Sequence, residues 1–482
     1  MNFRSFIFAT LLLSALTLSF SAVASRAQDQ PEPPPETPPD TMPGAPPKPA
    51  GYAFPGLLGP GEGDLQPDFS PLTGMQNTTL GLPEFRHSYW VPGVQFSSTI
   101  QSAPSGVAGG SSTWYANNYV LGNLSLLEAL GRSTLAVNYT GGGYFTTSST
   151  LGNGAYQQLG LAETYHSERW LLQIVDRFAY IPQSAFGFGG GTNLGVPGVG
   201  GTLGNTIPGL GGNYVPNQSI YGVGPYYSNT AALQASYALS RRTSITLAGS
   251  YGLQSFTQAG NIDSNVIVGS IGVNYALNAK DTIGVVYRYS GYHFPGDPQA
   301  YGSNVVNIAY GRKVTGHIGF RIFVGPQFTS YRIPIGNTTQ TTGFSASANL
   351  TYSLPRTSFG LYYLHGLSGG GGVLIGSDLD QVTANISRTL TRTWTGNINF
   401  GYARNSPVGG TSATGGVIYN DWFIGGGVGR PIGRNFSVAF AYTATIPTYS
   451  QSGCVGAACV PSTTYQTVTI NLQWHPRPFV LR

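Results

Sequence analysis

Apolar and small polar side chains alternate along most of the chain, from about residue 91 to residue 474. In residues 344–354, FSASANLTYSL, the side chains F, A, A, L, Y and L are separated by S, S, N, T and S. Because successive side chains of a β-strand point to opposite faces, this segment has one apolar face and one polar face. The same alternation recurs in residues 231–239, 393–402, 435–444 and 468–474.

The length of these segments indicates what the strands cross. Many run for roughly ten residues or more, about twice the mean strand of a globular protein. A tilted strand that crosses a bilayer needs about 9–11 residues. Length and period together therefore predict membrane-crossing β-strands.

Short and long connections alternate between the predicted strands, which is typical of an antiparallel up-and-down β-barrel. The short connections lie at 131–132, 167–168, 240–242, 278–281, 315–316, 355–356, 390–392 and 432–434. The long connections include 182–225, 295–301, 333–341, 368–377, 405–416 and 448–462.

The order of the connections also predicts the number of strands. The strand before the short turn at Gly131 runs toward the rim of short turns. An earlier strand must therefore run in the other direction, and residues 91–102 are the candidate. Counting from there to the segment that ends at Trp474 gives about eighteen strands, with both chain ends at the rim of short turns. Sixteen strands is the alternative, because residues 91–102 alternate only weakly. The predicted fold is an all-β transmembrane barrel over residues 91–482.

Composition separates this fold from its rivals. Charged residues make up 9% of the chain, against roughly 25% in a soluble domain. The mean hydropathy is −0.03, and no apolar run beyond the N-terminus approaches a membrane helix of about 20 residues. A glycine-rich low-complexity chain, with 69 glycines, would share this composition but not the strand period. A soluble propeller would place four short strands in its repeat of about 40–45 residues, where this chain has two long ones.

The first ninety residues divide into three segments. Residues 1–27 predict a secretory signal peptide, with Arg4, an apolar stretch and the small-x-small sequence Ala22-Val23-Ala24. Residues 28–50 are rich in proline and indicate a disordered linker or a ligand for an envelope partner. Residues 51–90 are rich in glycine and proline and predict either an irregular cap or a plug.

Aromatic residues near the strand ends predict girdles at the two membrane interfaces, because amphipathic rings favour the headgroup region. Ordinary β-propensity of aromatic residues is the competing interpretation. The girdle candidates are Tyr139, Trp170, Tyr237, Tyr275, Tyr352, Trp394, Trp422 and Trp474.

The signal peptide, alternating strands, unequal connections and aromatic strand ends resemble the bacterial outer-membrane β-barrel class in its porin-like size range. The resemblance covers residues 91–482 and implies an outer-membrane location with lipid as a partner. It also implies contact with the barrel-assembly machinery during biogenesis and a possible homo-oligomer. Such barrels often end on an aromatic residue, whereas this chain continues eight residues past Trp474, so Trp474 or Phe479 is the candidate signal.

The polar strand faces identify candidates for a pore lining. Arg288 and Arg321 lie opposite apolar faces, and Gln234, Asn349 and Asn399 are further polar candidates. Because a charged residue in lipid costs a few kcal/mol, the arginines are expected to point inward. There they would either favour anions or brace the wall through hydrogen bonds.

Three other features carry predictions. The glycine-rich loop 182–225 would either fold inward and narrow the pore or stay outside. Cys454 and Cys459, the only cysteines, predict a disulfide in an external loop of an exported protein. The adjacent Asp176 and Arg177 are expected near the external rim, since one of them must face outward.

The expected function is a porin-like channel for passive diffusion of small hydrophilic solutes, because barrels of 16–18 strands leave an aqueous channel. The alternative is a plugged structural barrel, acting as an anchor, an adhesin or part of an export system. The six histidines are scattered and no G-x-S-x-G motif occurs, so no enzyme, catalytic residue, cofactor or metal site is expected. The 23 basic residues are spread thinly and form no Lys/Arg cluster, so no nucleic-acid surface is expected.

Overall fold

A computed structural model shows how the predicted strands pair. It describes residues 72–73, 88–103, 113–148, 152–181, 225–257, 261–296, 299–332, 338–371, 374–408, 418–449 and 464–481. All of these belong to one compact unit, Tyr52–Arg482. The signal peptide, the proline-rich linker, loop residues 182–224 and both cysteines lie outside the described residues.

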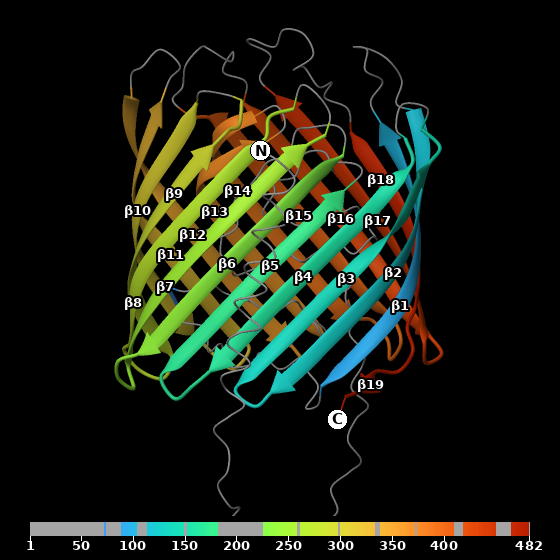
Figure 1. Cartoon of the computed structure of the whole chain (residues 1–482), viewed down its shortest axis with the longest axis horizontal. Coiled ribbons are helices and arrows are strands. Elements are labelled where there is room, and N and C mark those ends of the chain that lie inside the picture. Colours follow the sequence, from blue (N-terminus) through green and yellow to red (C-terminus); the bar gives the residue numbers. More distant parts are fainter. Residues whose placement is uncertain are drawn as a thin grey trace, which may run out of the picture. The chain divides into compact units, whose positions relative to one another are not determined.

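Eighteen long antiparallel strands form a closed up-and-down barrel, which confirms the predicted fold and strand number (Figure 1). Each strand pairs with its neighbours in the chain, and the strands run obliquely around the wall, as barrel closure requires. Among the described residues no helix is long and apolar enough to cross a membrane. The strands are β1 (Tyr89–Ala103), β2 (Thr113–Leu130), β3 (Ser133–Thr146), β4 (Gly154–His166), β5 (Trp170–Ile181), β6 (Tyr226–Ala238), β7 (Thr243–Phe256), β8 (Ser264–Ala276), β9 (Asp281–His293), β10 (Ala300–Lys313), β11 (Ile318–Arg332), β12 (Thr338–Leu354), β13 (Thr357–Gly371), β14 (Leu374–Thr389), β15 (Thr395–Pro407), β16 (Tyr419–Ile432), β17 (Phe436–Tyr449), β18 (Tyr465–Trp474) and the short β19 (Phe479–Val480).

The barrel closes where β1 meets β18. These strands pair from Val94 opposite Trp474 to Gln101 opposite Thr467. Beyond Trp474 the two residues of β19 take over and pair with Tyr89 and Trp90 of β1. Phe479 stacks on Trp90 with 4.7 Å between ring centroids. The C-terminal extension therefore lengthens the closing seam toward the rim of short turns.

All eight predicted short turns join consecutive strands at one rim. The β2–β3 turn includes Gly131, whose φ of 59° lies in the left-handed region that favours glycine. The first strand begins at Tyr89 rather than at Val91. It is paired along both edges, with β2 on one side and with the β18–β19 seam on the other.

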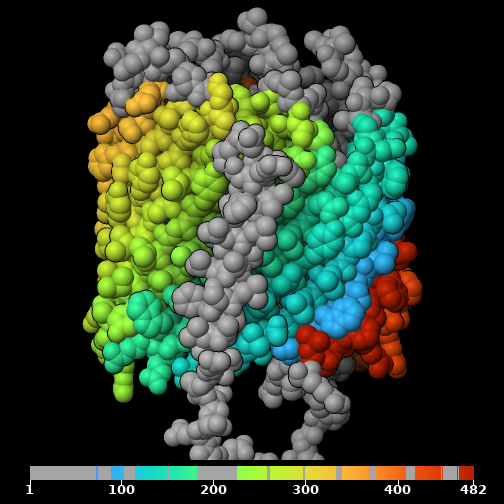
Figure 2. All heavy atoms as spheres, in the orientation of Figure 1, coloured from blue at the N-terminus to red at the C-terminus, as the bar shows by residue number. Residues whose placement is uncertain are grey.

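The two faces of the wall differ in chemistry, as the alternation predicts. On β12, Phe344 is exposed on the outer face, whereas Ser345 and Ser347 are buried on the lumen face. On β17, Phe440 and Tyr442 are likewise exposed outside. Figure 2 shows one side of this outer surface. An exposed apolar outer band with small polar side chains inside matches a wall solvated by lipid.

One part of the prediction is wrong. Residues 368–377 were expected to form a long loop, but β13 continues to Gly371 and β14 begins at Leu374. The pairing of β12 with β13 ends at Ala346 opposite His365, while β13 continues to pair with β14 up to Gly371 opposite Leu374. This end of the β13–β14 hairpin, residues 366–371 and 374–379, has left the barrel wall on its β12 side. We call it the inward hairpin.

Candidate functional site

The lumen face of the wall is the candidate functional site. Small and amide side chains line it, and several bond across neighbouring strands. Gln234 of β6 is fully buried and donates from Nε2 to Oε1 of Gln173 on β5, at 2.9 Å. At the seam, the hydroxyls of Thr99 and Thr469 lie 3.1 Å apart. These bonds join neighbouring strands and satisfy buried polar groups of the lumen face.

The lumen face also carries formal charges. Arg177 on β5, Arg288 on β9 and Arg321 on β11 have the same strand parity as buried lumen residues such as Gln173, and so face inward. Asp421 on β16 faces the same way and is fully buried. Among these four residues the positive charges outnumber the negative one.

The predicted pore-lining residues all fall on the lumen face, but they do not form one cluster. Arg321 and Asn349 are register partners on β11 and β12. Gln234 lies on β6, Arg288 on β9 and Asn399 on β15. Arg288 is only 8% exposed. Their functional role remains a prediction.

The inward hairpin reaches across the inner face of the wall toward β9. The Tyr292 hydroxyl of β9 donates to the backbone oxygen of Leu367 on β13 at 3.2 Å. Strands β10, β11 and β12 separate β9 from β13 around the wall, so this bond passes in front of their inner face. Gly376, whose φ is 62°, lies against the Tyr301 ring. A Cβ added to this glycine would be 3.1 Å from a carbon of the ring.

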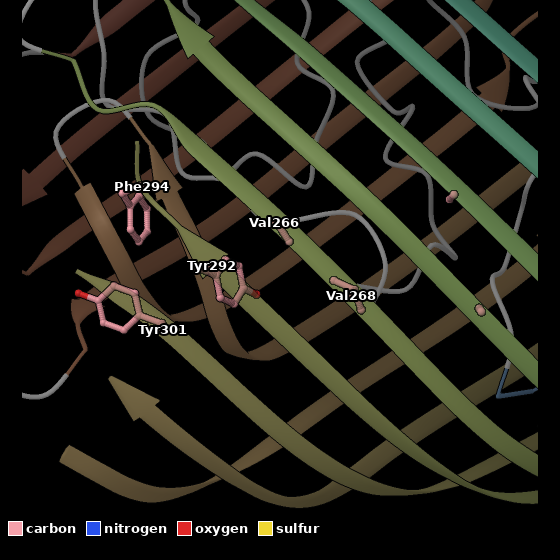
Figure 3. Close-up of a cluster of buried hydrophobic side chains, with 7 residues drawn as sticks. Val266, Val268, Tyr292, Phe294 and Tyr301 are labelled. Atoms are coloured by element: carbon pink, nitrogen blue, oxygen red, sulfur yellow. The ribbon is translucent and has the colours of Figure 1, made fainter. Parts of the chain in front are cut away.

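An apolar cluster holds the inward hairpin in place. Tyr292, Phe294 and Tyr301 group with Val266 and Val268 of β8 (Figure 3). Leu367 of the hairpin packs against this cluster. The rings of Phe294 and Tyr301 meet edge to face with 5.7 Å between centroids. Burial of this apolar surface stabilises the hairpin in its inward position.

The base of the hairpin is fixed by an ionisable pair. His365 Nδ1 lies 2.6 Å from Asp380 Oδ1 at the point where β13 leaves β12. Phe344 of β12 stacks on the His365 ring with 4.2 Å between centroids. The outer face of β12 therefore still contacts the strand that departs from it.

Aromatic residues on the lumen face were missed by the sequence analysis. Tyr119, Tyr144 and Tyr156 are buried together on β2, β3 and β4. Tyr144 donates to Asn117 Oδ1 at 3.0 Å. Their strand parity, shared with polar residues such as Asn117, is the signal that could have placed them inside.

The pair Asp176 and Arg177 is placed differently from the expectation. Both lie midway along β5, not beside Ile181 at its end. Arg177 faces the lumen, and Asp176 has the outward parity. Asn229 of β6 donates to Asp176 Oδ1 at 2.7 Å. A cross-strand amide thus partly satisfies a carboxylate that would be costly in bare lipid.

Most girdle candidates lie on the outer face near strand ends. Trp170 and Tyr237 meet near the short-turn rim with 4.6 Å between ring centroids. Trp422 contacts Tyr402 near the opposite rim, at 4.5 Å. Tyr139 differs, since it lies midway along β3 and donates its hydroxyl to Gln157 Oε1 at 2.5 Å. The remaining candidates are Tyr275, Tyr352, Trp394 and Trp474, all toward the short-turn rim.

Comparison with known proteins gives structural likenesses at low identity. The chain is similar to Pseudomonas aeruginosa OccK2 (OpdF), solved in complex with glucuronate, at 8% identity over 82% of this chain and 98% of that one, with a TM-score of 0.40. It is similar to the outer membrane protein opdK of Pseudomonas aeruginosa at 8% identity, over 81% of this chain and 98% of that one, with a TM-score of 0.41. It is also similar to Acinetobacter baumannii OccAB3 at 8% identity, over 81% of this chain and 99% of that one, with a TM-score of 0.40. No protein-family model and no curated protein matches the sequence. At these identities and TM-scores, the barrel architecture rests on the strand pairing of this chain itself.

Proposed function

We propose that the protein is an outer-membrane channel for passive diffusion of small hydrophilic solutes. The observation that carries the proposal is the closed barrel of eighteen strands with a polar lumen face and an exposed apolar outer face. Barrels of 16–18 strands enclose an aqueous channel, whereas barrels of about eight strands are filled by their own side chains.

The lumen charges favour anions over cations of the same size. Arg177, Arg288 and Arg321 face the lumen, against Asp421. Inward arginines lower the electrostatic barrier for an anion in a confined polar pore. The inward hairpin reduces the cross-section near the external end, so the proposal is limited to small solutes.

Three partners accompany this function. Membrane lipid contacts the apolar outer face. The barrel-assembly machinery would meet the closing seam, where Phe479 stacks on Trp90. A homo-oligomer would use outer-face residues with polar groups, such as Asp176 and Asn229.

Single-channel conductance in a planar bilayer tests the proposal, using the mature chain and a variant that lacks residues 28–87. The deletion must stop before Ser88, whose backbone oxygen accepts a hydrogen bond from Leu481 N at 2.8 Å. Stepwise currents with anion preference from the mature chain are the expected result. Silence from both proteins, after insertion is verified, would contradict a channel.

A plugged barrel is the second candidate function, because Leu72 and Thr73 are buried against the lumen face. In that case the protein would serve as an anchor, an adhesin or part of an export system. Current from the truncated variant alone would favour this alternative.

A further inference from the structure

Three neighbouring strands lack side chains at one place on the lumen face. Gly272 of β8, Gly284 of β9 and Gly311 of β10 all face inward near the short-turn rim. Gly284 is the register partner of Asn274, and Gly311 is the register partner of Thr282. The three glycines form a shallow recess in the wall, which we call the glycine recess.

Leu72 and Thr73 occupy the glycine recess. A Cβ on Gly272 would lie 2.5 Å from Thr73 Cβ, and a Cβ on Gly284 would lie 2.7 Å from Thr73 Cγ2. A Cβ on Gly311 would lie 3.0 Å from Leu72 Cδ1. Carbon atoms pack at about 3.5–4.0 Å, so any larger residue at these positions would displace the segment.

A directional hydrogen bond adds to this shape match. The Thr73 backbone N–H donates to Asn274 Oδ1 at 2.7 Å, between residues 201 positions apart in the chain. Asn274 donates in turn from Nδ2 to Ser244 Oγ and Thr246 Oγ1, both at 3.3 Å. Those two bonds orient the amide so that its oxygen points to Thr73.

Both residues that occupy the glycine recess are buried. Leu72 is 6% exposed and Thr73 is 3% exposed. A Cβ added to Gly311, which would contact Leu72, would also lie 3.6 Å from Arg321 Cγ. The buried pair therefore lies beside one of the lumen arginines.

We infer that the glycine recess is an anchoring site that holds the chain's own N-terminal segment inside the lumen at Leu72 and Thr73. The site recognises a leucine side chain and the backbone N–H of the next residue. This inference rests on the barrel alone. Its consequence for permeation rests on the proposed function, because an anchored segment reduces the current only if the barrel conducts.

Engineered disulfides test the anchor independently of any current. In the full mature chain with Cys454→Ser and Cys459→Ser, the test pairs are Leu72→Cys with Gly311→Cys and Thr73→Cys with Gly272→Cys. A disulfide needs its Cβ atoms about 3.5–4.5 Å apart, so residues in such close contact can be bridged after a small adjustment. The readout is a shift in gel mobility that reduction reverses.

Two matched pairs serve as controls. Gln173→Cys with Gln234→Cys joins neighbouring wall residues and should always cross-link in the folded barrel. Leu72→Cys with Ile308→Cys places the second cysteine on β10 but on the exposed outer face, and should not cross-link.

Cross-linking of at least one test pair, with the Ile308 pair negative, is the expected result. If neither test pair cross-links while the Gln173 and Gln234 pair does, the anchoring site is refuted, whatever the bilayer currents show. For permeation, Gly272→Val is expected to raise the conductance by displacing Thr73, because the three atoms nearest to a Cβ added at Gly272 all belong to Thr73. Gly269→Val on the outer face of β8, with open space around it, should leave the conductance unchanged.

Discussion

At the scale of single residues, side-chain parity decides whether a residue meets lipid or the lumen. Neighbouring positions on one strand have opposite environments, as Asp176 and Arg177 show on β5. The inner position accepts a cation, whereas the outer carboxylate needs the Asn229 amide beside it. Substitutions of similar chemistry should therefore have opposite consequences on the two faces.

Selectivity should depend on the lumen arginines. We expect Arg321→Gln to lower the preference for anions, because it removes a positive charge from the lumen face. The reversal potential in a KCl gradient measures this shift. Arg388→Gln is the matched control, since Arg388 is exposed on the outer face of β14. An equal shift from both variants would contradict a role of the lumen charge.

The loss of stability caused by a charge on the outer face should depend on how deep that position lies in the membrane. Val285 of β9 is 52% exposed outside, and Leu277, in the short turn that precedes β9, is 48% exposed. We expect Val285→Lys to lower the free energy of unfolding by about 2–4 kcal/mol, and Leu277→Lys by about 0–1 kcal/mol. Urea unfolding in lipid vesicles, followed by tryptophan fluorescence, measures both. Equal losses would show that the lipid boundary lies elsewhere.

At the scale of elements, the inward hairpin is the main departure from a regular barrel. Strands β13 and β14 remain paired with each other along the hairpin, whereas the pairing between β12 and β13 ends at Ala346. Contacts from Tyr292 and Tyr301 compensate for the lost pairing on that edge. The hairpin is thus held by a few side chains rather than by a continuous ladder.

The hydrogen bond from Tyr292 should limit the motion of this hairpin. We expect Tyr292→Phe to destabilise the inward position by about 1 kcal/mol, because the Leu367 carbonyl loses its donor. Larger fluctuations in the single-channel current are the measurable result. Tyr287→Phe is the control, since Tyr287 lies on the outer face of β9 and donates to Asn304 of β10. Fluctuations of the same size in both variants would argue against this contact.

The short strand β19 should contribute to barrel closure. Phe479→Ala removes the ring stacked on Trp90, a contact worth about 0.5–1.5 kcal/mol beyond its buried area. We expect a lower yield of folded barrel, measured as the fraction with folded gel mobility before heating. Leu481→Ala should have less effect, because the contribution of Leu481 to the seam is a backbone bond to Ser88.

At the scale of the whole molecule, the sequence predicts what repeats and misses what occurs once. Each strand repeats the same division of faces, so Phe344 and Ser345 could be assigned from the period alone. The inward hairpin could not, because its glycine-rich sequence resembles a loop and its partner Tyr292 lies 75 positions away. The hydrogen bond between Thr73 and Asn274 joins residues 201 positions apart, so no local sequence pattern predicts it.

The closing seam has a consequence for the order of events during synthesis and export. Thr99 meets Thr469 across the seam, 370 positions later in the chain. A strand edge with unpaired backbone groups is a template for association with other chains. Strand β1 presents such an edge from its first appearance until the final strands arrive, and pairings this distant in sequence form slowly. A nascent copy thus needs a temporary partner for β1 throughout its passage, and a truncation near the C-terminus would leave that edge open to aggregation.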